Sequence, residues 1–195
     1  MLRRLTWAAL LTTLAAGVVG VARQRIEAGQ VARGELPRAS AAADVPPRVT
    51  YGPLAARLAS WVPAPPASPA SRLAAASWVG PLTVIGLGLA LLAGRVPRWS
   101  AEHGCFVAEG IRGPSRIALR SVGASANTVG QVVLSTHTET SPALLAHEAV
   151  HVRQGERLGP LLFPTYVWLA ARYGYRDHPL ERAARLGARA VVGGS

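Results

Sequence analysis

The chain has 195 residues, half of them hydrophobic and only 16% charged, and its formal net charge is +11. Soluble domains usually carry about 25% charged residues, so this composition points to membrane segments. All 21 basic residues are arginine, and they are spread along the chain without the basic stripe and interleaved aromatic residues of a nucleic-acid surface. We therefore expect no nucleic-acid partner. The single cysteine, Cys105, excludes an internal disulfide.

The first segment, residues 1–25, is predicted to be a signal anchor or transmembrane helix. Arg3 and Arg4 precede an uncharged run from Leu5 to Ala22. The small residues that end this run are a weak cleavage signal, which favours an uncleaved anchor. Residues 26–72 are rich in proline and alanine and are predicted to form a largely disordered linker. A short surface helix is expected within this linker, over Leu54–Trp61.

Residues 73–94 are predicted to form a transmembrane helix. The segment has no charged residue and is flanked by Arg72 on one side and by Arg95 and Arg98 on the other. About 20 apolar residues suffice to cross the hydrocarbon core, and the alternative is a buried core helix. With Arg3 and Arg4 in the cytoplasm, two spans would return residues 95–195 to the cytoplasm, but the arginines of the linker favour the cytoplasmic side for the linker itself. The side of the membrane on which the C-terminal domain lies therefore stays open, and the cytoplasm is favoured.

Residues 95–195 are predicted to form an α+β domain. Turn signals separate the candidate strands, and Ser141 followed by Pro142 predicts the start of a helix that ends near Gly155. A last helix is expected from Pro179. The three candidate strands are His103–Gly110, Ser115–Val122 and Asn127–Ser135.

The sequence AHEAVH, residues 146–151, carries the most specific chemical signal. On a helix, His147 and His151 lie one turn apart on the same face, where two imidazoles can share one Zn²⁺. Glu148 lies beside that face, where its carboxylate can act as a general base toward a zinc-activated water. The alternative is an ordinary charged helix whose two histidines bind no metal.

A catalytic zinc of this kind needs a third protein ligand and one open position. The acidic residues and histidine downstream are Glu156, Asp177, His178 and Glu181. Glu156 is too near the end of the same helix to reach the metal. Glu181, in the first turns of the last helix, is favoured over its rival His178, although Glu181 could instead pair with Arg185 at helical spacing.

The runs TVGQVVLS, LLAHEAVHVRQGERLGPLLFPTY and HPLERAA resemble small, largely uncharacterised bacterial membrane-associated metallopeptidases of the gluzincin type, from Thr128 to Leu186. The resemblance implies a minimal zincin-like domain with a few strands, an active-site helix and a glutamate helix. It assigns the metal to His147, His151 and Glu181, and the general base to Glu148. It also implies that extended substrate pairs with the strand before the active-site helix, formed by Gln131, Val132, Val133 and Leu134. His178 and Leu180 depart from the pattern, which has Asn and Phe there.

The sequence therefore predicts a zinc-dependent metalloendopeptidase anchored in the bacterial cell membrane, with a peptide or protein as substrate. Zn²⁺ is the expected cofactor, and Glu148 the expected base for water attack on the amide. One alternative is a catalytically silent zinc-fold membrane protein with a binding or regulatory role. The other is a structural membrane protein in which the histidines are incidental.

Overall fold

The computed structural model describes residues 2–37 and 46–192. Residue 1, residues 38–45 of the predicted linker and residues 193–195 of the predicted C-terminal domain lie outside this range. The chain divides into two compact units, of which unit 1 comprises Met1–Ser60 and Phe163–Arg182, and unit 2 comprises Trp61–Leu162 and Ala183–Ser195. Helices and a small sheet are both present, which confirms the α+β fold class.

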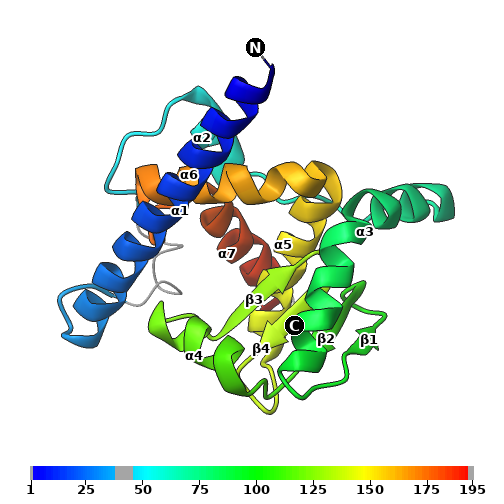
Figure 1. Ribbon diagram of the computed structural model, residues 1–195. Helices are drawn as coiled ribbons and strands as arrows, with labels where there is room; N and C mark the ends of the chain where they lie inside the picture. The colour runs from blue at the N-terminus through cyan, green and yellow to red at the C-terminus, as the bar shows by residue number, and fades with distance from the viewer. Residues whose placement is uncertain (1, 38–45, 193–195) are drawn as a thin grey trace. The chain divides into compact units, whose positions relative to one another are not determined.

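Unit 2 is built on a four-stranded sheet with the strand order β1-β2-β4-β3 (Figure 1). Each edge strand pairs antiparallel with its neighbour, β1 with β2 and β3 with β4. The two central strands, β2 and β4, are parallel. The strands are β1 Arg98–Ser100, β2 Cys105–Ala108, β3 Ala126–Val129 and β4 Val132–Ser135.

The sheet of unit 2 lies between two helices, α3 (Pro69–Leu92) and α5 (Pro142–Leu158). Val132 and Leu134 of β4 pack in one apolar cluster with Ala90 of α3. Val133, which points to the opposite face, packs with Val152 of α5 in a second cluster. All four residues of β4 are therefore buried, and the strand is the centre of unit 2.

Helix α3 begins at a capping box, in which the Ser68 side chain accepts from the Ser71 backbone and the Ser71 side chain accepts from the Ser68 backbone. Its buried residues, Val79, Thr83, Gly86 and Ala90, recur at helical spacing and form the face that packs on the sheet. Among the described residues, α3 is the one helix that is long and apolar enough to cross a membrane. Length and composition do not distinguish such a helix from a core helix, so the predicted span stays a prediction.

The β3–β4 turn approaches α3 very closely. Gly130 has φ +63°, and a Cβ atom there would collide with the backbone of Leu82 and Thr83. The backbone N–H of Gln131 donates to the Thr83 hydroxyl at 3.1 Å. Only glycine satisfies both the positive φ and the close approach, so this turn fixes the hairpin on the helix.

Two of the three strand predictions need correction. Ser115–Val122 is not a strand, because residues 113–121 form helix α4 (Gly113–Ser121). Pro114 starts this helix at a position where its missing N–H costs nothing, and arginine, alanine and leucine favour helix within it. Asn127–Ser135 is not one strand but the β3–β4 hairpin, whereas the strand expected within His103–Gly110 is confirmed as β2.

Unit 1 contains helix α1 (Leu2–Ala32), helix α2 (Pro53–Ala59) and most of helix α6 (Leu162–Tyr173). The Arg23 guanidinium donates to the carbonyls of Ala171 and Arg172 at 2.7 and 2.8 Å. The Glu27 carboxylate accepts from the backbone N–H groups of Tyr175 and Arg176 at 2.9 and 3.0 Å. The C-terminal half of α1 therefore holds the end of α6 and the loop after it. Helix α2 confirms the expected short helix.

Helix α7 (Pro179–Val192) begins at the predicted residue and is continuous across the boundary between the units, which falls after Arg182. In unit 2, α7 lies against α5, since a Cβ atom at Gly187 would be 2.6 Å from Cγ2 of Val150. The first turn of α7, in unit 1, carries Glu181.

Candidate metal centre

Helix α5 carries both candidate histidine ligands, and its start follows from local sequence. The Ser141 hydroxyl accepts from the Leu144 N–H at 3.3 Å, and Pro142 occupies the first turn, as the sequence predicts. The helix continues past the expected end at Gly155 to Leu158, and Gly159, with φ +55°, ends it. Both histidines therefore stand on a rigid, regular element.

The two histidine rings are neighbours on one face of α5. Their ring centroids are 4.9 Å apart and the ring planes meet at 78°. His151 is buried and His147 is half-buried. A four-residue step on a helix produces this arrangement directly, and it is the arrangement in which two imidazoles can bind one ion.

Glu181 in the first turn of α7 is the third member of a group that could hold a metal ion together with His147 and His151. Each residue offers one ligand atom, and the three atoms lie within 4.8 Å of one another. Glu181 is buried, and its Oε1 accepts from the Tyr166 hydroxyl at 2.7 Å. Two imidazoles and one carboxylate are a donor set that suits Zn²⁺, so the residues fit the expected cofactor.

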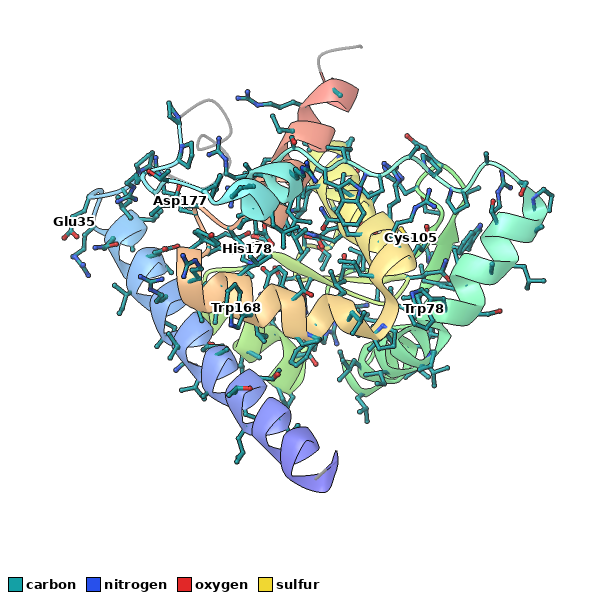
Figure 2. All side chains as sticks on the ribbon, turned by 90° about the horizontal axis from the view of Figure 1, so that it is seen from above. Glu35, Trp78, Cys105, Trp168, Asp177 and His178 are labelled. Carbon is teal, nitrogen blue, oxygen red and sulfur yellow. The ribbon has the colours of Figure 1, made fainter. Side chains whose placement is uncertain are left out.

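His178, the rival ligand, is not a member of this group of described residues. It is completely buried, and its Nε2 lies 3.0 Å from the backbone carbonyl of Tyr166. Its ring also packs on the Tyr166 ring, with centroids 4.3 Å apart. Because a carbonyl only accepts hydrogen bonds, Nε2 of His178 carries a proton in this contact and does not offer a lone pair to a metal. Figure 2 shows His178 above α6.

Glu148, the candidate base, is buried with only 4% of its surface exposed. The Thr128 hydroxyl on β3 donates to Oε2 of Glu148 at 2.7 Å. This short hydrogen bond orients the Glu148 carboxylate. Glu148 is thereby fixed from the sheet side while its neighbour His147 belongs to the candidate metal group.

The resemblance implies that substrate pairs with Gln131, Val132, Val133 and Leu134, and the structure places these residues in the β3–β4 turn and in the central strand β4. Val132, Val133 and Leu134 are buried, and β4 is hydrogen-bonded to β2 on one side and to β3 on the other. A peptide cannot pair with a strand whose two edges are already paired. Gln131 lies in the turn, where its amide donates to Glu156 at 2.7 Å. In the sheet formed by the described residues, the unpaired edge nearest α5 belongs to β3 instead.

Cys105 on β2 is buried and packs with Val133 and Val152. Figure 2 labels it close to α5. Burial raises the pKa of its thiol from 9.0 to about 11, and the nearby carboxylates of Glu148 and Glu156 add to the rise, while Arg153 opposes it. The thiol is therefore a neutral core group at ordinary pH, in agreement with the absence of a nucleophile signature around it.

Three polar residues contact members of the candidate site, and the sequence analysis did not predict these contacts. They are Thr128 beside Glu148, Tyr166 beside Glu181, and Gln154, whose Oε1 lies 2.9 Å from Nδ1 of His151. Gln154 had a usable signal, because a residue three positions after a ligand histidine shares its helical face. Thr128 and Tyr166 reach the site through the fold and left no local signal.

A family model described as the eCIS core domain matches residues 112–159. The matched part runs from the start of α4 through β3, β4 and α5, so it includes His147, Glu148 and His151 and ends before Glu181. No curated protein and no solved structure matches the chain. The chain is thus similar to the eCIS core domain over the segment that carries two of the three candidate ligands.

Proposed function

We propose that this protein is a zinc-dependent metallopeptidase that acts at a membrane. The observation that supports the proposal most directly is the meeting of His147, His151 and Glu181 in one candidate metal group, with the buried carboxylate of Glu148 next to His147 in the chain. Structural zinc sites in proteins usually have four protein ligands, whereas catalytic sites have three and keep one position open. A group of three is the catalytic pattern.

In this proposal, His147, His151 and Glu181 hold the ion, which would act as a Lewis acid and acidify a water molecule. With the ion bound, the Glu148 carboxylate would serve as the general base for attack of water on the peptide carbonyl, and it would return the proton to the amide nitrogen as the C–N bond breaks. The Thr128 hydroxyl donates to Oε2 of Glu148 and so orients the proposed base.

Membrane association is the second part of the proposal and rests on α3. One face of this helix packs on the sheet, while large apolar side chains away from that face are exposed, among them Val84 and Ile85. Exposed apolar surface of this kind is costly in water. We propose that this outer face of α3 contacts lipid.

The test of the metal site is the zinc content of the purified full chain. We expect one zinc per chain, lost in His147→Ala and in Glu181→Ala and kept in His103→Ala, because His103 contacts Ser100 and is not in the candidate group. A wild-type chain without zinc would overturn the proposal.

The test of catalysis compares wild type with Glu148→Gln on a library of unstructured peptides. We expect the variant to keep its zinc and to lose hydrolysis by at least about 100-fold, the usual contribution of a general base. Zinc binding without hydrolysis in the wild type would favour the binding or regulatory role over the enzyme.

A further inference from the structure

We propose that Gln154 is a positioning residue that holds His151 in the Nδ1–H tautomer and so reserves Nε2 of His151 for a metal ion. The metal part of this inference rests on the proposed function, whereas the tautomer does not. The observation that carries the inference is a chain of two contacts, a buried one from His151 to Gln154 and a part-buried one from Gln154 to the backbone of Trp61.

The first contact joins two side chains on one face of α5. Nδ1 of His151 lies 2.9 Å from Oε1 of Gln154, and the two residues are three positions apart. Gln154 is completely buried and His151 is 8% exposed. Water therefore competes little with this hydrogen bond, and a mismatch of donor and acceptor here would be costly.

The second contact decides which end of the Gln154 amide faces the histidine. The amide Nε2 of Gln154 lies 3.5 Å from the carbonyl oxygen of Trp61. A carbonyl oxygen only accepts, so the N–H₂ end of the amide belongs on that side. The opposite orientation would place two oxygens against each other. The oxygen end of Gln154 consequently faces His151.

The backbone segment that provides this carbonyl is itself fixed on α5. The Arg157 guanidinium, one turn beyond Gln154, donates to the carbonyl of Ala64 at 3.3 Å. Val62 lies close to Gly187 of α7, since a Cβ atom at that glycine would be 3.0 Å from Cγ1 of Val62. Residues 61–64, which belong to the predicted linker, are therefore held in place by contacts with α5 and α7.

The tautomer of His151 follows from these contacts. Because Oε1 of Gln154 can only accept, Nδ1 of His151 must donate and so carries the proton of the neutral ring. The lone pair is then on Nε2, whereas free histidine in water prefers its proton on Nε2. A metal-binding histidine needs the nitrogen that faces the ion deprotonated, and a hydrogen bond to the other nitrogen sets this.

The tautomer can be measured without any metal. We would record long-range ¹H–¹⁵N spectra of the chelator-treated full chain at a pH where its imidazoles are neutral, and assign His151 by the loss of its signals in His151→Ala. We expect the Nδ1–H pattern in wild type and a change toward the Nε2–H pattern in Gln154→Leu, which keeps the bulk and removes the acceptor.

Zinc affinity is the second readout, measured by competition with a chromophoric chelator. We expect Gln154→Leu to bind zinc about 10–100-fold more weakly than wild type. Gln131→Leu is the matched control, because it removes a half-buried glutamine amide that contacts Glu156 and no ligand.

The two readouts separate the two claims. An Nε2–H pattern for His151 in wild type would overturn the role of Gln154, whatever the zinc content. A wild-type chain with the Nδ1–H pattern that changes in Gln154→Leu, yet binds no zinc, would support the tautomer control and overturn the proposed metal function.

Discussion

The Thr128 hydroxyl on the edge strand β3 donates to Oε2 of Glu148 on α5 at 2.7 Å, and the two residues are 20 positions apart in the chain. The contact connects the sheet to the carboxylate that we assign as the base. Since Glu148 is buried, its oxygens depend on partners from the protein, and Thr128 provides one of them.

We expect Thr128→Val to leave Oε2 of Glu148 without its hydroxyl donor and to lower the free energy of unfolding by about 1–3 kcal/mol. Thr128→Ser keeps the donor and should lose much less. Urea denaturation of the chain measures both. If Thr128→Val were as stable as Thr128→Ser, the hydroxyl would have no role in holding Glu148.

Tyr166→Phe removes the hydroxyl that donates to Oε1 of Glu181 at 2.7 Å. We expect zinc affinity to fall about 10–100-fold, the usual effect of losing a partner of a metal ligand. Tyr173→Phe is the control, because the Tyr173 hydroxyl accepts from Arg172 and its ring contacts Tyr51. Chelator competition compares the variants, and equal affinities in the two would exclude a role of Tyr166 in positioning Glu181.

Gly130→Ala is expected to be strongly destabilising, by roughly 1–3 kcal/mol for the positive φ alone, with the collision against the α3 backbone adding to this loss. Gly88→Ala on α3 is the matched control, because a Cβ atom there meets nothing within 4 Å. Alanine in a helix interior is favoured over glycine by about 0.5–1 kcal/mol. Thermal unfolding should therefore move in opposite directions in the two variants.

The raised pKa of Cys105 predicts a loss of stability at alkaline pH. The folded state keeps the thiol protonated up to about pH 11, whereas the unfolded chain releases the proton near pH 9.0. The stabilisation from this difference is therefore complete below pH 9.0 and is lost as the pH rises to about 11. Cys105→Ala should show a flatter fall of the unfolding free energy across this range. Profiles of equal slope would contradict the assignment.

Lipid contact by α3 can be tested with an environment-sensitive dye on Val84→Cys in a Cys105→Ala background. Val84 is 69% exposed on the outer face of α3. We expect its emission to shift to the blue when the full chain is placed in vesicles. A dye on Ile117→Cys, a 70% exposed position on α4, should keep the emission it has in water. An unchanged spectrum at Val84→Cys would exclude lipid contact at this face.

Helices α5 and α7 could be predicted because their signals are local. Ser141 and Pro142 mark the start of α5, and Pro179 marks the start of α7. The segment 115–122 is predicted as a strand and is a helix, because a short segment with mixed apolar and polar residues suits either element. The sequence predicts one strand where the structure has the hairpin at Gly130, because apolar residues on both sides of the turn continue the strand pattern.

The candidate ligands could be predicted from the helical spacing of His147 and His151, and Glu181 from a resemblance. The residues that orient them depend on contacts that no local pattern records, such as Thr128 with Glu148 or Tyr166 with Glu181. The position of β4, which we predict to meet substrate, depends on the fold in the same way. Strand order decides which strand lies at an edge, and the parallel pairing of β2 with β4 places β4 in the centre.

The sheet order also has a consequence for how the chain folds. The β3–β4 hairpin closes over the two-residue turn at Gly130 and Gln131, whereas β2 reaches β4 only after the chain has passed through α4. Contacts between near neighbours in the chain form faster than contacts that close long loops. We therefore expect the hairpin to form early and β2 to join it late, so that the pairing of β2 with β4 is the slow step in building unit 2.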